Sequence, residues 1–427
     1  MKRFFAYFVV LSMLICSFSI VGCNDEVIDI YEESSTDEGE ETEKETQKPT
    51  EKPTEKPTEK PEEENKTPAT DGKIHIGMTW SRSGDNGYLK GSAVKHGVEA
   101  AIKEINEAGG IGGLELALLV EDDKDDPELI PELYAKLLAD GMQISLGSVN
   151  EEYCAIFANN ARTDGVFTLS PTAKDRDIFE YERFFGMDMA YMDEMDVLID
   201  YLRSLNSSKK FPIIFDSDYP YAVERKDYLL KTAPDLFQSS LVIDDKYYWD
   251  EMDWDMLEPF LEYDNFVTLD YLDETYLSSI AGDIEFLSDE EKNFIGVYTD
   301  YDFNWGMVND YGATVLLPFD ISAKTGEYAE FFEKYKDFHY DQDLVALGYD
   351  SVYAIYEALL LAIENGTEIR ADMTAEEFGE ILDGVFSDGF EFDALTGGEG
   401  DGRGNVTWYS DGRPKKKLTP VVFEYDW

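Results

Sequence analysis

Hydrophobic residues between positions 73 and 427 recur in two patterns that alternate along the chain. Short apolar runs are followed by longer stretches in which apolar residues are spaced three and four apart. Val94, Val98 and Ile105, for example, share one face of a helix, which two glycines then end. Short strands that alternate with amphipathic helices predict a parallel sheet with helices on both faces.

This alternation runs through the chain twice. The first round predicts strands at 74–78, 114–120, 143–146 and 166–169, with helices at 93–106, 127–140 and 152–163. The second round predicts strands at 212–215, 241–243, 266–269 and 293–297, with helices at 192–205, 222–233, 252–262 and 276–286. Three more helices are expected at 329–338, 351–364 and 374–383, and two tail strands, 406–408 and 421–423, flank a turn at Asp411-Gly412. Two rounds predict two α/β lobes.

The first 23 residues follow neither pattern. Lys2 and Arg3 precede an apolar stretch over 4–21, which is the order typical of a secretory signal. The stretch closes on Gly22-Cys23, and small residues followed by cysteine resemble the bacterial lipobox. That resemblance implies cleavage before Cys23 and lipid attachment to it, because two acyl chains hold a protein stably on a membrane. A plain signal peptide or an uncleaved helix is the alternative.

Residues 24–72 have the composition of an unfolded tether. They carry 18 acidic and 6 basic residues, and Pro49-Thr50-Glu51-Lys52 repeats at Pro53 and at Pro57. Such a segment buries too little apolar surface to offset the entropy of ordering, and its regular prolines favour extended chain. We expect it to lift the folded part off the membrane; a specific binding motif is the alternative.

Charge and cysteine content exclude several classes of protein. The net charge is −56, and about −46 of it belongs to residues 73–427, which argues against nucleic acid and anionic membrane surfaces as partners. Beyond Cys23 only Cys154 remains, so no internal disulfide is expected. His75, His96 and His339 lie far apart, and no metal or other cofactor is expected. No nucleophile elbow or phosphate-binding loop is found, so an enzyme is not expected.

A series of short motifs resembles the type I periplasmic binding proteins, specifically the branched-chain amino-acid (leucine/isoleucine/valine-type) receptors of ABC importers. The motifs fall in order over residues 73–423: Ile76-Gly77, Ser83-Gly84, Gly91, Gly97, Ala100, Ile105-Asn106, Ala108-Gly109-Gly110-Ile111, Gly113, Glu121-Asp122-Asp123, Asp126-Pro127, Leu146-Gly147, Gly165-Val166, Ser170-Pro171-Thr172-Ala173, Leu347-Gly348-Tyr349-Asp350-Ser351, Leu395-Thr396-Gly397, Gly404-Asn405-Val406 and Asp411-Gly412. The resemblance is strongest at 73–174 and in the last third of the chain.

The resemblance implies an α/β fold of two Rossmann-like lobes joined by a three-strand hinge. The chain crosses between the lobes near Gly186, Pro318 and Thr396. Ligand binding is then closure of the lobes around a small molecule. The expected division is a signal peptide at 1–22, lipidated Cys23 and tether at 23–72, lobe one at 73–187 plus 319–395, and lobe two at 188–318 plus 396–427.

Ligands of open α/β sheets sit beyond the carboxyl ends of the strands, where loops lead into helices. The resemblance implies a family mode of binding for an amino-acid ligand. Hydroxyls and backbone N–H groups of lobe one bind the ligand's carboxylate, and an acidic residue binds its ammonium. The candidate ligand-binding residues in these loops are Ser83, Gly84, Lys90, Glu151, Glu152, Thr172, Lys174, Tyr219, Tyr221, Tyr298 and Asp300.

Two of these loops depart from the family pattern. The loop after Gly147 is rich in small hydroxyl residues in the family, but here it carries Glu151 and Glu152. The loop after Ser170-Pro171 ends in Lys174 rather than in threonine or a small residue. One hypothesis is that Glu152 and Lys174 pair with each other. An amino acid, a ligand with both charges, and a polar cationic ligand all stay open.

The predicted function is therefore capture of a small polar solute, an amino acid or related compound, by a lipid-anchored protein on the outer face of the cell membrane (or in the periplasm). An ABC permease in the membrane would take up the solute. The alternative is a sensing or interaction lipoprotein with a repurposed cleft that is not coupled to transport. A secreted hydrolase is a third hypothesis.

Overall fold

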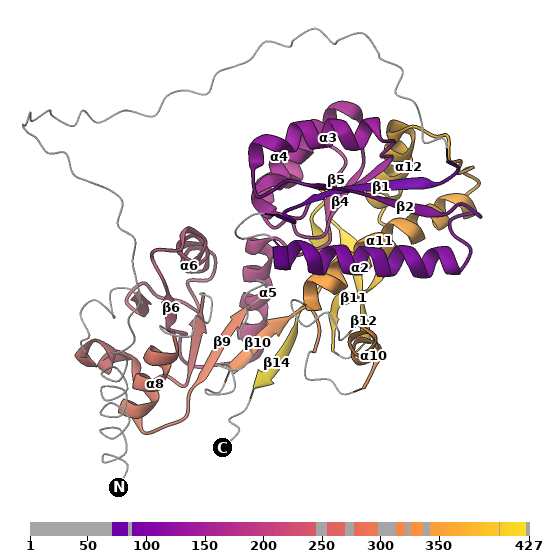
Figure 1. Cartoon of the computed structure of the whole chain (residues 1–427). Helices are drawn as coiled ribbons and strands as arrows, with labels where there is room; N and C mark the ends of the chain where they lie inside the picture. Colours follow the sequence, from indigo (N-terminus) through magenta and orange to yellow (C-terminus); the bar gives the residue numbers. More distant parts are fainter. Residues whose placement is uncertain are drawn as a thin grey trace, which may run out of the picture. The chain divides into compact units, whose positions relative to one another are not determined.

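The computed structural model describes residues 71–83, 88–244, 254–269, 277–297, 313–320, 325–335, 342–400 and 402–423 (Figure 1). The predicted signal peptide, Cys23 and the predicted tether up to residue 70 lie outside these residues. The described strands form a five-stranded sheet, a six-stranded sheet and a smaller three-stranded sheet.

The first sheet has the strand order β2-β1-β3-β4-β5, and all neighbouring strands are parallel. Its strands are β1 (Ile74–Trp80), β2 (Leu116–Asp122), β3 (Ile144–Ser148), β4 (Thr168–Ser170) and β5 (Phe184–Gly186). Its helices are α2 (Tyr88–Glu107), α3 (Ile130–Ala139), α4 (Glu151–Ala161), α11 (Gln342–Glu364) and α12 (Ala375–Ser387), with 3₁₀ turns at Pro127–Leu129, Arg162–Asp164 and Arg176–Glu180. The sequence pattern missed β5, which is three residues long.

Helices cover both faces of this sheet, as the alternation predicted (Figure 1). Ile74, Ile76 and Met78 of β1 pack in one core with α2 and α11. The opposite face carries a second cluster, in which Tyr134 of α3 and Phe157 of α4 pack edge to face. A sheet buried on both faces accounts for the nearly continuous apolar runs of its strands.

Two glycines bring α2 and α11 into backbone contact. A Cβ on Gly97 would lie 1.9 Å from the Val345 carbonyl oxygen, and a Cβ on Gly348 would lie 2.4 Å from the Val94 oxygen. Any side chain at either position would therefore separate the two helices. The motif glycines at 97 and 348 thus have a packing role.

The second sheet has the order β14-β10-β9-β8-β6-β7, parallel except for the antiparallel pair of β10 and β14. Its strands are β6 (Ile213–Phe215), β7 (Val242–Asp244), β8 (Asn265–Thr268), β9 (Asn293–Val297), β10 (Ala313–Leu317) and β14 (Thr419–Phe423). The helices of this part of the chain are α5 (Tyr191–Ser204), α6 (Pro220–Thr232), α8 (Leu277–Ser288) and α10 (Glu327–Lys334). The sequence pattern missed β10.

Three predicted elements differ from the structure. The helix expected at 252–262 is a 3₁₀ helix, Trp254–Phe260, because Pro259 inside it has no N–H to donate. The helix expected from 351 begins at Gln342, and residues 344–352 are all buried, so they show no amphipathic pattern. The strand expected from 114 begins at Leu116, because Leu114 closes a tight turn with Ile111.

The tail strands are not partners of each other. Residues 406–408 belong to β12 (Gly402–Trp408), which pairs with β11 (Phe392–Glu399) and, across the Asp411-Gly412 turn, with β13 (Pro414–Lys415). Residues 421–423 belong to β14, which joins the second sheet through β10. The missed strands β11 and β13 thus form the smaller sheet with β12.

Asp350 ties α11 to this smaller sheet. Its buried carboxylate accepts hydrogen bonds from the backbone N–H of Leu395 (3.1 Å), from the backbone N–H of Thr396 (2.9 Å) and from the Thr396 hydroxyl (2.9 Å). Burial raises the pKa of Asp350 although these donors oppose the shift. The sequence motifs that contain Asp350 and Thr396 are therefore hydrogen-bonded to each other and have a structural role.

The α/β fold with parallel sheets is confirmed, whereas the lobe boundaries and the hinge stay predictions. By length and composition α11 could span a membrane. However, 72% of its apolar window is buried inside the protein, as in a core helix.

Candidate ligand-binding site

The candidate site lies at the carboxyl edge of the first sheet. Because its strands are parallel, the loops after β1, β2, β3 and β4 all emerge at this edge. Thr79 of β1 lies opposite Ser148 of β3, and Trp80 lies opposite Asp122 of β2. The sheet thus gathers the loops that the sequence marked as candidates.

Hydrogen bonds fix the loops after β3 and β4 against each other. The Ser170 hydroxyl accepts from the backbone N–H of Thr172 (3.3 Å) and of Ala173 (3.1 Å). The Thr172 hydroxyl donates to the carbonyl oxygen of Val149 (3.0 Å) in the neighbouring loop. These loops are therefore held in a defined shape.

Two buried hydroxyls at this edge lack a hydrogen-bond partner among the described residues. They are Thr79 Oγ1 and Ser148 Oγ, and both side chains are fully buried. A buried polar group without a partner costs about 1–3 kcal/mol. The edge thus has hydrogen-bonding capacity that the described residues do not use.

A buried group of charged side chains lies beside these loops, and we call Lys174, Asp188, Tyr191, Glu194 and Arg225 the Lys174 cluster. The Lys174 ammonium lies 2.8 Å from Glu194 Oε1 and 3.8 Å from Asp188 Oδ2. Lys174 and Glu194 are both fully buried. A buried ion pair of this kind needs close geometry because desolvation of each charge is costly.

The ring of Tyr191 lies close to both cations of the Lys174 cluster. The Lys174 ammonium lies 4.8 Å and the Arg225 guanidinium 4.6 Å from its ring centroid, both within cation–π range. Its hydroxyl donates to Glu151 Oε2 at 2.8 Å, and its ring lies 5.0 Å from that of Tyr221. Tyr191 thus connects the loop after β3 with α5 and α6.

Burial and neighbouring charge shape the electrostatics around the cluster. Burial lowers the pKa of Lys416, whose ammonium lies 3.9 Å from Asp188 Oδ1. Burial, and then the charge of Glu151, raises the pKa of Tyr221. The region therefore presents fixed positive and negative groups within a few ångströms of each other.

Four of the predicted site residues meet in this region: Thr172 on the fixed loop, and Glu151, Lys174 and Tyr221 around Tyr191. The carboxylate of Glu194 lies 2.8 Å from the Lys174 ammonium, whereas Glu152 is exposed in the first turn of α4. The hypothesis that Lys174 is compensated by Glu152 is therefore replaced by compensation from Glu194 and Asp188.

The other predicted residues lie differently. Ser83 is exposed and binds Asp122 through its backbone N–H (3.1 Å) and its hydroxyl (2.7 Å). Tyr219, directly before α6, is 42% exposed. The backbone of Lys90 lies in the first turn of α2. Gly84, Tyr298 and Asp300 lie outside the described residues.

Sequence reasoning missed Tyr191, Glu194 and Arg225. Glu194 lies three residues after Tyr191 and four before Leu198, on the buried face of α5. Arg225 likewise lies between Ala222 and Leu229 on the buried face of α6. A charged residue in the apolar phase of a helix was the signal that could have found both.

Within the described ranges, no group of three or more His, Cys, Asp or Glu side chains is arranged to hold a metal ion. Cys154 is buried, and burial raises the pKa of its thiol to about 12, so it is a poor nucleophile at neutral pH.

Comparison with known proteins shows what this chain is similar to. Residues 73–255 match the family model described as periplasmic binding protein. The Leu/Ile/Val-binding protein homolog 1 of Brucella abortus (strain 2308) is 35% identical over 100 residues, which are 23% of this chain and 27% of that protein. The chain thus spans about a quarter of the length of the curated relatives it matches.

Solved structures share the fold at low identity. A putative branched-chain amino acid ABC transporter from Rhodospirillum rubrum has a TM-score of 0.64 at 14% identity, covering 82% of this chain and 98% of that one. A solute binding protein of an ABC transporter from R. palustris, in complex with benzoate, has a TM-score of 0.57 at 15% identity, covering 82% and 95%. These likenesses concern the fold alone.

The family comprises binding proteins rather than enzymes, as the sequence predicted. The resemblance to the leucine/isoleucine/valine type is confirmed by the named relatives. Residues 73–255, fewer than half of the chain, therefore match the periplasmic binding protein family, and the chain has the type I periplasmic binding protein fold.

Proposed function

We propose that this protein captures a small polar solute at the carboxyl edge of the first sheet, as the binding component of an ABC importer. The observation that carries the proposal is the pair of buried hydroxyls, Thr79 and Ser148, which lack partners among the described residues. They lie beside two loops fixed by hydrogen bonds. A preformed polar site is what a small polar ligand requires.

The Lys174 cluster restricts the ligand class. Lys174 and Arg225 lie next to Glu194 and Asp188, so the site offers both signs of charge. A ligand with an anionic and a cationic group, such as an amino acid or a related compound, can be oriented by such a site. The names of the relatives point to Leu/Ile/Val for one protein and to benzoate for another, so the fold does not choose the ligand.

The remaining parts of the proposal concern place and partner. Cys23 is the proposed lipid site, residues 24–72 are the proposed tether, and the folded part then faces the extracellular side or the periplasm. Two acyl chains on one cysteine give stable anchoring. An ABC permease in the same membrane is the proposed partner that takes up the solute.

A ligand screen tests the proposal. We expect leucine, isoleucine, valine, other amino acids, benzoate or polyamines to include one compound that stabilises the protein by about 3–4 kcal/mol at saturating concentration. The measurement is thermal unfolding of the full chain with and without each compound. Unchanged melting across the panel would contradict solute capture.

Paired variants locate the site once a ligand is found. Glu151→Gln removes a charge next to Tyr191, and we expect it to weaken ligand binding about tenfold or more, because a charged hydrogen bond is worth about 1.5–3 kcal/mol. Glu182→Gln changes an exposed carboxylate away from the site and is expected to bind normally. Equal affinity of both variants would contradict the placement of the site.

A second candidate function is sensing or interaction through a repurposed cleft. It is favoured by one observation: Lys174 is already countered by Glu194 and Asp188 of the same chain. On this alternative no compound in the panel raises the melting temperature, and the neighbouring genes encode a receptor kinase. Adjacent permease and ATPase genes would instead support import.

A further inference from the structure

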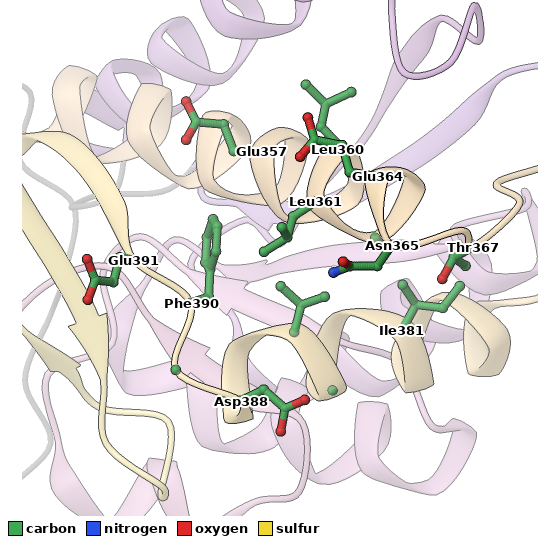
Figure 2. A pocket seen from close by; sticks show the side chains of 14 residues that line it. Glu357, Leu360, Leu361, Glu364, Asn365, Thr367, Ile381, Asp388, Phe390 and Glu391 are labelled. Carbon is green, nitrogen blue, oxygen red and sulfur yellow. The ribbon is translucent and has the colours of Figure 1, made fainter.

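A groove separates the C-terminal part of α11 from α12 (Figure 2). It encloses about 720 Å³, within the usual range of roughly 300–1,000 Å³ for ligand pockets. Its apolar side chains come from both helices and from the segment after α12: Leu360, Leu361, Ile381, Val385 and Phe390. Leu361 is 37% exposed, a large apolar side chain that solvent reaches.

Four carboxylates surround these apolar side chains. They are Glu357, Glu364, Asp388 and Glu391, all exposed, and none of the fourteen lining residues is basic. None of the four forms an ion pair with any residue in the described ranges. A cation placed at this rim would therefore meet four carboxylates and no basic side chain of the lining.

The pKa of Glu357 reflects the electrostatic environment of one rim carboxylate. Partial burial raises the pKa of Glu357, the charge of Arg403 opposes the shift, and the carboxylates of Asp393 and Asp350 add to it. A raised carboxyl pKa means that the ionised form is disfavoured at this place. A bound cation would relieve that penalty.

Gly384 is one of the residues that line the groove. It lies inside α12, where glycine costs about 1 kcal/mol relative to alanine, yet a Cβ there would meet nothing within 4 Å. Packing within the described structure therefore does not require a glycine here. Because Gly384 lines the groove, a bulky side chain at this position would lie beside the lined space.

The groove is separate from the candidate ligand site. It ends at Asn365 and Thr367, beside the chain that leads to Ala371 and Met373. The Gln143 side chain, just before the amino end of β3, donates to the carbonyl oxygens of Ala371 (3.0 Å) and Met373 (2.7 Å). This side is the amino edge of the sheet, whereas the ligand loops lie at the carboxyl edge.

The negative charge of the rim argues against several candidate occupants of the groove. A second copy of this chain carries the same net charge of −56, and residues 24–72 carry −12 with few apolar residues. Both would be repelled by the rim, and so would an anionic membrane surface. A cationic amphipathic segment matches both the apolar lining and the carboxylate rim.

We propose that the α11–α12 groove is a docking site for a basic amphipathic segment of another protein, which lays its apolar face on Leu361 and Val385 and its lysines or arginines against Glu364 and Asp388. Docking here leaves the carboxyl edge of the sheet free for solute. The contact is thus compatible with a ligand-loaded binding protein.

A synthetic amphipathic helix of leucine and lysine serves as the probe. Its binding to the full chain is measured by fluorescence anisotropy at physiological salt, against a scrambled peptide of the same composition. We expect Gly384→Trp to weaken binding at least about tenfold, because it fills the groove without changing charge. Gly384→Ala, which changes the same helix but fills little space, is expected to bind within about twofold of the parent.

Charge variants separate a specific groove from general attraction to an acidic protein. We expect Glu364→Gln with Asp388→Asn to weaken binding roughly tenfold, and Glu128→Gln with Glu132→Gln, an exposed acidic pair elsewhere, to leave it unchanged. Unchanged binding by Gly384→Trp, or equal loss in both charge pairs, overturns the proposal. A parent dimer in sedimentation that Gly384→Trp abolishes also overturns it, since the occupant is then a second copy.

Discussion

Helix α11 meets its two neighbours in opposite ways. Against α2 the backbones touch, and Gly97 and Gly348 are glycines because a Cβ would lie 1.9 and 2.4 Å from carbonyl oxygens. Against α12 a groove of about 720 Å³ opens, and Gly384 is a glycine with open space around it. Packing alone explains the first interface. The second interface leaves apolar surface open in the groove and leaves the rim carboxylates without ion-pair partners among the described residues. A partner outside this chain is therefore the proposed occupant.

The largest effect is expected where the helices touch. Gly97→Ala places a methyl group inside contact distance of the Val345 oxygen, which lies on the α11 backbone and has no freedom to rotate away. We expect a loss of about 3 kcal/mol or more in the free energy of unfolding, at or above the upper end for overpacked sites. Urea unfolding of the parent and the variant measures it.

Gly384→Ala is the matched comparison for this prediction. If Gly97→Ala is as stable as Gly384→Ala, the backbones of α2 and α11 do not touch at Gly97 as described. A loss confined to Gly97→Ala supports the contrast between the two interfaces.

A smaller loss is expected from the carboxylate that α2 presents to α11 and α10. Glu104 accepts hydrogen bonds from Lys334 and Tyr335, from the Tyr349 hydroxyl at 2.9 Å and from the Tyr353 hydroxyl at 3.2 Å. We expect Glu104→Gln to lose about 1–2 kcal/mol, because hydrogen bonds to a charged group are lost and the site is partly exposed. Urea unfolding at pH 7 measures it.

The pH dependence of this contribution has a definite sign. Burial alone would raise the pKa of Glu104, but the hydrogen bonds from Lys334, Tyr335 and Tyr349 outweigh it and lower the pKa below its ordinary 4.5. A lowered folded-state pKa means that the stability is present above pH 4.5 and is lost as pH falls through the lower value. The difference between parent and Glu104→Gln should therefore shrink in acid; a constant difference would contradict this explanation.

Elements with a regular amphipathic pattern were predicted from the sequence, whereas elements without one were missed or misplaced. Strands β1 to β4 and helices α2, α3, α4 and α12 were predicted within about five residues, because apolar residues such as Val94, Val98 and Ile105 repeat with the period of a helix. The start of α11 was missed because residues 344–352 are buried all round and have no polar face. Pro259 shortened another helix to a 3₁₀ segment.

The site was predictable in its place but not in its contacts. The carboxyl edge follows from the strand order, and Lys174 was marked there from its loop. Its partner Glu194 comes from α5, and Arg225 comes from α6. Which helix lies against a loop depends on tertiary packing, and local spacing does not contain it.

The next prediction is a gain. Gly384→Ala removes the entropy cost of a helical glycine, and its methyl group meets nothing within 4 Å. We expect an increase of about 0.5–1 kcal/mol in the free energy of unfolding. Thermal unfolding measures it, and a loss of stability would mean that α12 packs more tightly than the groove allows.

The smallest effect concerns the rim of the groove. Glu357→Gln removes an ionised carboxyl that partial burial and the neighbouring Asp393 and Asp350 disfavour. We expect stability at pH 7 to rise by about 0.5 kcal/mol or less, since the residue is exposed and its charge is screened. Because its folded-state pKa is raised above the ordinary 4.5, the parent takes up a proton as pH falls through that raised value, and its penalty then disappears. The gain should therefore be seen at neutral pH and fade in acid, whereas Glu132→Gln on α3 should show no such gain; a gain that persisted in acid would assign the effect to packing and not to charge.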